Sequence, residues 1–233
     1  MKQALRTALL WGGALLRPNH GPKVVYYHDV GQTYTAMGTP LRLVLAHMKC
    51  LREGDVVCFD DGFRGIWDHR EALVRAHVRP KVFIAVRLVG SPGFLTWDEI
   101  RLLQNRHGFE FQCHTWSHQT LAGPFITSSP PRKEEDSWFR FELEASKKEI
   151  EQQLGRSVTE LCFPAGCYNE AVLSRCRAAG YVSVYSSDPV GGTDGYVKAR
   201  CIAQDASGLA FRAILRGGMW VFASRYRGIH YVG

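Results

Sequence analysis

The chain has 233 residues, of which 45% are hydrophobic and 22% charged, a composition that excludes a disordered or fibrous protein. Its 29 Lys and Arg residues outnumber 22 Asp and Glu residues, giving a net charge of +7. The basic residues are nevertheless scattered and form no recognisable nucleic-acid motif, so we expect no nucleic-acid partner.

Residues 1–19 are predicted to form a helical extension before the main domain. Leucines alternate there with Lys2 and Arg6 in a pattern typical of a short amphipathic helix. The apolar stretch 8–16 contains two glycines, is followed by no cleavage site and is too short to span a bilayer. Two interpretations remain open, a helix packed on the body of the protein or peripheral contact of residues 1–18 with an anionic membrane. We prefer the first, because the helix is short and its polar face is thin.

Residues 20–233 are predicted to form one α/β domain. Six runs rich in β-branched and aromatic residues are expected to be buried strands, at 24–27, 56–59, 82–86, 109–113, 161–163 and 182–185. Strands that alternate with helices favour parallel pairing in βαβ units, in a barrel or a doubly wound sheet.

Helices with readable ends lie between these strands. Thr96 and Glu99 predict a capping box for a helix that runs to about 106. A second helix is expected over 138–154, and a third from Asn169 to Gly180. The proline-rich segment 123–136 is expected to be a surface loop.

Candidate functional residues stand where four of the predicted strands end. His28 and Asp29 follow the first strand, and three further groups follow later strands: Asp60 and Asp61, His114 and His118, and Pro164 to Gly166. Because parallel strands point the same way, we expect these residues to converge on one rim of the sheet.

Two histidines and one carboxylate are predicted to form a metal site on this rim. At i and i+4, His114 and His118 can turn both imidazoles to one side of a helical turn, and Asp60 or Asp61 supplies the carboxylate. Such a set leaves positions open for a water and a substrate oxygen. Each element alone has a structural explanation, as a turn or as a hydrogen-bonded histidine, but their joint placement favours the metal site.

Three segments carry a family resemblance. Residues 58–63 read C-F-D-D-G-F, residues 114–118 read H-T-W-S-H and residues 163–169 read F-P-A-G-C-Y-N. In order and spacing they resemble the motifs T-F-D-D-G-[FY], H-[ST]-x-x-H and P-x-G-x-Y-N of the polysaccharide deacetylases of carbohydrate esterase family 4. The resemblance implies a single-domain deformed (β/α) barrel and metal-dependent hydrolysis of an acetyl group from a sugar.

The resemblance also implies roles for individual residues. Asp60 would be the general base, while Asp61, His114 and His118 would hold a divalent metal, Zn²⁺ foremost, whose bound water is the nucleophile. The acetyl oxygen would contact the metal and a backbone N–H near Ala165.

Aromatic residues in two motif loops are candidates for contact with the sugar. Trp116 lies within the second motif and Tyr168 within the third, where either ring can face a pyranose or pack in the core.

Three features depart from the family pattern. The third motif usually contains an arginine that orients the base, but residues 161–163 read L-C-F. The usual Asp-Trp fourth motif is not visible after Tyr185, and Asp188 has no tryptophan beside it. The family usually has a further histidine late in the sequence. The counterpart here is His230, three residues before residue 233.

A subset of the family, resembling the de-N-acetylases of poly-N-acetylglucosamine, carries its acid histidine in an early Y-H-x-V segment. Residues 27–30 match that segment, so we assign His28 as the acid that protonates the leaving amine. Asp29 either orients His28 or caps the turn.

The function predicted by these residues is removal of the N-acetyl group from an N-acetylhexosamine in a polysaccharide or glycolipid. Two alternatives are an O-acetyl esterase and a catalytically silent glycan-binding homologue. Seven cysteines, an odd number without a C-x-x-C pair, predict free thiols suited to a reducing compartment. We therefore favour a cytoplasmic or membrane-peripheral location over secretion.

Overall fold

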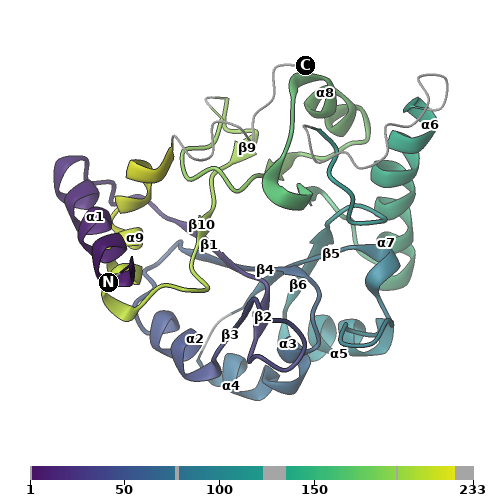
Figure 1. The fold of residues 1–233 in the computed structure, drawn as a ribbon. Coiled ribbons are helices and arrows are strands. Elements are labelled where there is room, and N and C mark those ends of the chain that lie inside the picture. Colours follow the sequence, from purple (N-terminus) through teal and green to yellow (C-terminus); the bar gives the residue numbers. More distant parts are fainter. Residues whose placement is uncertain (1, 77–78, 123–134, 193, 224–233) are drawn as a thin grey trace.

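Parallel strands form one curled sheet in the computed structural model, which describes residues 2–76, 79–122, 135–192 and 194–223 (Figure 1). The strands are β1 Val24–Tyr27, β4 Val56–Asp61, β5 Lys81–Ile84, β6 Glu110–Cys113, β7 Glu160–Cys162, β8 Ser183–Tyr185, β9 Val197–Lys198 and β10 Cys201–Ile202. Their order across the sheet is β10-β1-β4-β5-β6-β7-β8-β9. A separate parallel pair consists of β2 Asp29–Val30 and β3 Gly38–Thr39.

The two edge strands of the sheet are neighbours in sequence. Only Ala199 and Arg200 separate β9 from β10, and the three peptide units from Lys198 to Cys201 span at most about 11 Å. Because β9 pairs with β8 and β10 pairs with β1, this short link holds the opposite edges of the sheet together. The sheet is therefore curled into a deformed barrel, which confirms the predicted fold.

Alternate strand residues face the inside of this barrel. One side chain from each of five strands forms a small interior cluster: Tyr26, Cys58, Phe83, Cys162 and Tyr185. The residues between them join the larger core beneath the helices. Burial on both sides explains the continuous apolar runs of β1 and of the first four residues of β4. Asp60 lies two residues after the inward-facing residue of β4 and therefore also points into the barrel.

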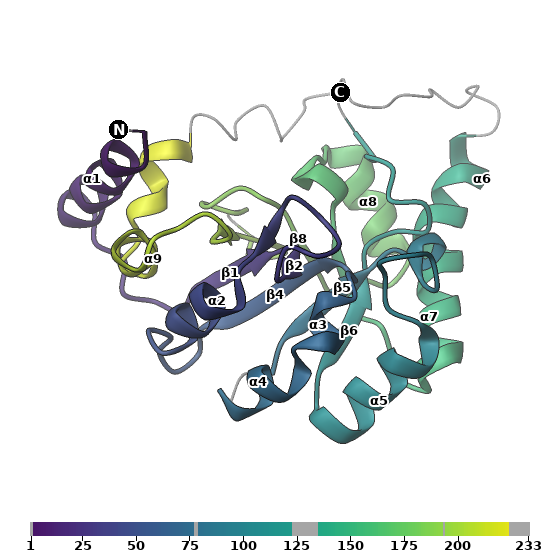
Figure 2. The same cartoon turned by 60° about the horizontal axis from the view of Figure 1, so that its bottom comes forward.

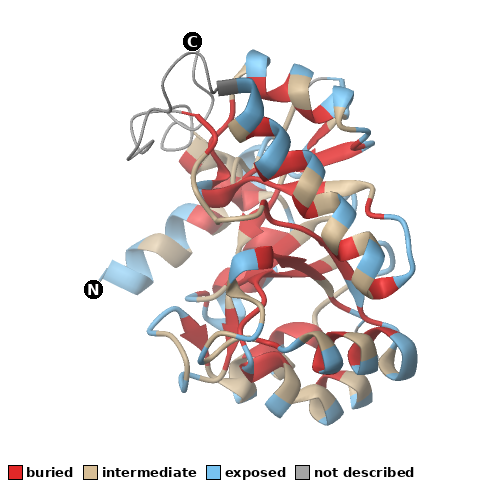
Figure 3. Cartoon of the chain, turned by 90° about the vertical axis from the view of Figure 1, so that its right-hand side faces the viewer, coloured by how far each residue is buried: buried red, intermediate tan, exposed pale blue. Residues whose placement is uncertain are grey.

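Helices cover the outside of the sheet (Figures 1 and 2). They are α1 Lys2–Leu16, α2 Leu41–Met48, α3 Gly65–Asp68, α4 Arg70–Arg75, α5 Trp97–His107, α6 Glu135–Arg140, α7 Ser146–Leu154, α8 Glu170–Ala178 and α9 Gly208–Leu215. Shorter turns are η1 Val86–Leu88, η3 Pro164–Gly166 and η4 Gly218–Phe222, with a π-helical turn at η2 Phe141–Ala145. Buried residues follow the strands and the inward faces of these helices (Figure 3).

Several predicted helix ends are confirmed by their hydrogen bonds. The capping box of Thr96 and Glu99 starts α5, and Gly108 follows it in the left-handed conformation at φ 70°. Gly155 ends α7 in the same way at φ 62°. The Asn169 side chain caps α8.

The predicted helix over 138–154 is corrected in two respects. Helical structure begins earlier, at α6, and η2 interrupts it before α7. Residues 135 and 136 of the predicted loop thus belong to α6, while residues 123–134 lie outside the described residues. The Ser146 hydroxyl donates to the carbonyls of Glu142 and Leu143, which accompanies the widened turn.

The N-terminal helix packs against α9 and η4 at one side of the barrel (Figure 2). Leu10, Gly13 and Ala14 form its buried face. The indole N–H of Trp220 donates to the Gly13 carbonyl at 2.8 Å. One face of α1 thus rests on the body of the protein, as the preferred interpretation of this segment expects.

Two adjacent glycines allow a test of this packing. A Cβ atom on Gly13 would lie 2.4 Å from Cγ1 of Val221, whereas a Cβ on Gly12 would meet nothing within 4 Å. Gly13→Ala is therefore expected to lower the free energy of unfolding by about 1–3 kcal/mol through overpacking. Gly12→Ala should raise it by about 0.5–1 kcal/mol through helix propensity. Urea unfolding measures both, and shifts of the same sign would contradict this docking.

Candidate metal and catalytic site

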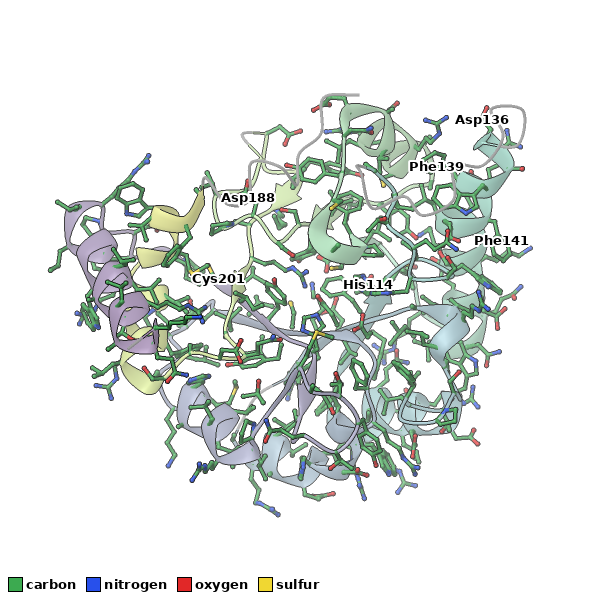
Figure 4. All side chains as sticks on the ribbon, viewed as in Figure 1. His114, Asp136, Phe139, Phe141, Asp188 and Cys201 are labelled. Atoms are coloured by element: carbon green, nitrogen blue, oxygen red, sulfur yellow. The ribbon has the colours of Figure 1, made fainter. Side chains whose placement is uncertain are left out.

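Asp61, at the end of β4, meets two histidines that follow β6. Its Oδ1 atom lies 3.3 Å from Nε2 of His114 and 2.9 Å from Nε2 of His118. Burial alone would raise the pKa of Asp61, but the two imidazoles hold it well below its usual value. Asp61 Oδ1 is buried and has no well-oriented hydrogen bond from the described residues. Three potential ligand atoms thus converge on one place near the middle of the barrel, where Figure 4 labels His114.

The two histidines lie on an irregular loop, so the prediction of a helical turn at 114–118 is wrong. Thr115 and His118 adopt left-handed conformations, at φ 70° and 63°, which fold the loop back on itself. The His118 N–H donates to Thr115 Oγ1 at 3.1 Å. Nδ1 of His114 lies 2.7 Å from the carbonyl oxygen of Cys162, which leaves Nε2 free to act as a ligand.

Backbone strain is concentrated at the predicted site. Four non-glycine residues of the described chain have positive φ, and all four belong to the motif segments: Asp61, Thr115, His118 and Ala165. Each such conformation costs about 1–2 kcal/mol. Strain of this kind persists where the surrounding structure enforces it, and it clusters at functional sites.

Asp60 is paired with an arginine that the motifs do not reveal. Nη1 of Arg200 lies 2.7 Å from Oδ1 of Asp60, with side-chain exposures of only 1% and 5%. Arg200 Nε donates to the Ser186 carbonyl, and its guanidinium carbon lies 4.2 Å from the centroid of the Tyr26 ring. Burial by itself would raise the pKa of Asp60, but the charge and hydrogen bond of Arg200, together with the charges of His114 and His28, outweigh burial and lower it. Asp60 is therefore ionised and oriented.

Arg200 thus pairs with Asp60, although no arginine is present in the third segment. It enters from the link between β9 and β10, while Cys162 stands at the end of β7. The sequence signal that marks it is a single arginine between two short β-rich pairs, at 197–198 and 201–202. This signal points to Arg200 only once the two edges of the sheet are known to meet at the link between β9 and β10.

His28 follows β1, and its Nδ1 atom lies 2.7 Å from Oε1 of Gln204. Its charge contributes to the lowered pKa of Asp60, which places the imidazole within electrostatic reach of that carboxylate. Asp29 instead accepts a hydrogen bond from the Val30 N–H at 2.8 Å. Burial raises the pKa of Asp29 to about 7. Among the described residues, His28 is therefore paired with Gln204, while Asp29 accepts a backbone N–H.

The three residues predicted to contact substrate differ in exposure. Ala165 is exposed, whereas Tyr168 is 3% exposed and stacks on Phe163 with ring centroids 5.3 Å apart. Trp116 is half-buried, and the centroid of its ring lies 4.6 Å from that of Phe141. Phe141 belongs to η2 and is labelled in Figure 4. His230 lies outside the described residues.

Glu142 supports the histidine loop from the π-helical turn η2. The side chain is nearly fully buried, and its Oε2 accepts hydrogen bonds from the N–H groups of Trp116 and Ser117 at 3.0 and 2.9 Å. Its Oε1 accepts the Ser117 hydroxyl at 2.7 Å. Sequence periodicity places Glu142 as an ordinary helix residue, so this contact is found only in the structure.

Two clusters of described residues have metal-ligand chemistry, and both include His114. The cluster of Asp60, His114 and Cys162 is unsuitable, because Arg200 already neutralises Asp60 and burial raises the pKa of the Cys162 thiol well above its usual value. The cluster of Asp61, His114 and His118 offers two imidazole nitrogens and one ionised carboxylate, a donor set that fits Zn²⁺.

Removing Arg200 tests the ion pair. Arg200→Met leaves Asp60 as an unpaired buried charge, so the free energy of unfolding should fall by about 3–5 kcal/mol. Asp60→Asn combined with Arg200→Met should recover part of this loss, because no charge then remains unpaired. Denaturant unfolding of the two single variants and the double variant measures the coupling, and simple additivity would exclude a direct interaction.

The Glu142 contact predicts a loss of metal affinity without loss of any ligand. Glu142→Gln removes the negative charge of the carboxylate that accepts hydrogen bonds from two N–H groups. Changes to groups that orient metal ligands typically lower metal affinity about 10–100-fold. Glu144→Gln is the matched control, because Glu144 lies exposed on the same turn. Zn²⁺ affinity is measured by competition with a chelating dye. Equal affinities for the two variants would show that Glu142 does not position the loop.

Comparison with known proteins identifies the family and the fold. The sequence profile of the family described as polysaccharide deacetylase matches residues 54–184, more than half of the chain. No curated protein matches the chain in sequence. Among solved structures, IcaB from Ammonifex degensii is similar in fold, with a TM-score of 0.71 and 15% identity over 85% of this chain and 98% of that chain.

Two further solved structures share this fold. A polysaccharide deacetylase from Bacillus cereus has a TM-score of 0.68 and 18% identity, over 83% of this chain and 68% of that one. A de-N-acetylase from Aggregatibacter actinomycetemcomitans has a TM-score of 0.67 and 16% identity, over 79% and 96%. At these identities the likeness concerns the fold.

Proposed function

Because the chain belongs to the polysaccharide deacetylase family, we propose that it hydrolyses the N-acetyl group of an N-acetylhexosamine in a polysaccharide or glycolipid. The observation that carries the proposal is the position of an ionised, arginine-paired carboxylate, Asp60, next to the ligand cluster of Asp61, His114 and His118. This pairing of a base with a metal-type donor set suits attack of water on an acyl carbon.

Asp61, His114 and His118 would hold the divalent cation, which when bound acts as a Lewis acid on the acetyl oxygen and lowers the pKa of a water. Asp60 is the proposed base. Its carboxylate takes the proton of the attacking water, and Arg200 keeps it aligned and ionised beforehand. The exposed Ala165 stands on the third motif loop, where its backbone N–H is the proposed donor to the oxyanion.

His28 is the proposed acid. With Nδ1–H donating to Gln204 Oε1, Nε2 is the ring nitrogen left to protonate the nitrogen of the leaving amine as the C–N bond breaks. The products are acetate and a free amino sugar. An ester substrate would need the same groups, with an alcohol as the leaving group, so O-acetyl esterase activity is the alternative that the assay must separate.

Acetate release from chitooligosaccharides tests the base and the metal together. Asp60→Asn should lower kcat by about 10²–10⁴-fold, because the base is lost. Asp98→Asn, at an exposed carboxylate on α5, is the matched control and should retain wild-type activity. Chelation should abolish turnover, and added Zn²⁺ should restore it. Activity that survives chelation or the Asp60 substitution would refute the mechanism.

A parallel assay on acetylated xylan separates the alternatives. Release from the ester alone would favour an O-acetyl esterase. Tight binding of chitooligosaccharide by the zinc-loaded protein, with no turnover of either substrate, would favour a silent glycan-binding homologue.

A further inference from the structure

The N-terminal helix α1 has a second apolar face that points away from the barrel. Leu5, Leu9 and Leu16 are 62%, 45% and 81% exposed, and their spacing places them on one side of the helix. Leu15, 77% exposed, borders this side. Of the ten large apolar side chains that are exposed in the described part of the chain, these four lie on α1. We call them the outer leucine face; such a concentration of exposed apolar side chains marks an interaction surface.

A basic cavity of about 690 Å³ adjoins the outer leucine face. Trp11 and Leu15 of α1 line it together with Lys49, Arg212 and Arg216, and no Asp or Glu is among its lining residues. The guanidinium carbon of Arg216 lies 5.0 Å from the centroid of the Trp11 ring. Because Leu15 belongs to both surfaces, the apolar face and the positive charge are continuous.

We propose that the outer leucine face and this basic cavity together bind the surface of a bilayer that contains anionic phospholipids. The leucines would enter the boundary between headgroups and acyl chains, while Lys49 and Arg212 would meet lipid phosphates. No helix among the described residues is long and apolar enough to cross a membrane.

Charge argues for a lipid surface over a second copy of the chain. In a symmetric dimer the same surface patch meets itself, so two copies of the cavity would approach each other. Their lysines and arginines would repel, with no acidic lining residue to compensate. An anionic bilayer complements both the charge and the apolar face.

Vesicle co-sedimentation tests the apolar part of this proposal. Wild-type protein should bind vesicles of phosphatidylcholine mixed with phosphatidylglycerol. The variant Leu5→Gln/Leu9→Gln/Leu16→Gln should bind on the order of tenfold more weakly. Leu102→Gln/Val182→Gln, at exposed apolar positions outside α1, is the control and should bind as wild type. Equal unfolding midpoints establish that all these variants are folded.

The contribution of the basic residues is tested with separate variants. Lys49→Gln/Arg212→Gln should weaken binding to the anionic vesicles on the order of tenfold. Arg106→Gln/Lys148→Gln removes two exposed charges from α5 and α7 and should leave binding unchanged. Equal binding of wild type to pure phosphatidylcholine vesicles would overturn the electrostatic contribution.

The proposal is overturned if wild-type protein does not bind the anionic vesicles, or if the triple leucine variant binds them as well as wild type. A dimer seen by sedimentation velocity, lost in the triple leucine variant while vesicles remain unbound, would identify a second copy as the occupant instead. None of these readouts uses catalysis, so the test is independent of the proposed deacetylase activity.

Discussion

The buried ion pair between Asp60 and Arg200 connects β4 to the link that joins the two edge strands of the sheet. A carboxylate in this apolar interior requires a partner, because an uncompensated buried charge costs several kcal/mol. The partner comes from the link of two residues that holds the edges of the sheet together. Closure of the barrel and ionisation of the proposed base therefore depend on the same residue, and a sheet that failed to curl would leave Asp60 without its counter-charge.

Around this pair, residues that are not themselves candidate ligands hold the candidate ligand groups in place. The Cys162 carbonyl orients His114 through a hydrogen bond, and Thr115 Oγ1 accepts a hydrogen bond from the His118 N–H. The Glu142 carboxylate accepts hydrogen bonds from two backbone N–H groups of the loop. Such support lets the loop hold left-handed residues that would relax in a free peptide. The arrangement keeps three ligand atoms pointed at one place, which reduces the reorganisation needed on binding a cation.

Much of this structure could be predicted from local sequence patterns. The strands and most helix ends follow from β-branched runs and capping residues, since both signals are short-range. The convergence of Asp61, His114 and His118 follows from the polarity of parallel strands. The strand that begins at 56 was predicted to end at Phe59, whereas Asp60 and Asp61 form its last residues, which directs Asp60 inward.

What could not be predicted depends on contacts between distant segments. Arg200 meets Asp60 across 140 residues of sequence, and the pairing becomes visible only once the barrel is closed. Glu142 reaches the histidine loop because a π turn interrupts a helix that periodicity presents as continuous. The helical turn expected at 114–118 was wrong because hydrogen bonds to the loop favour two left-handed residues there. In each case tertiary contacts override the local pattern.

Asp60 is proposed to serve as a base beside a metal site rather than as a ligand of it. The most direct measurement is the anomalous scattering of crystals of the zinc-loaded protein. We expect one ion within bonding distance of Asp61, His114 and His118, with Arg200 still paired to Asp60. An ion bound by Asp60 and the Cys162 sulfur, with Arg200 displaced, would contradict the account.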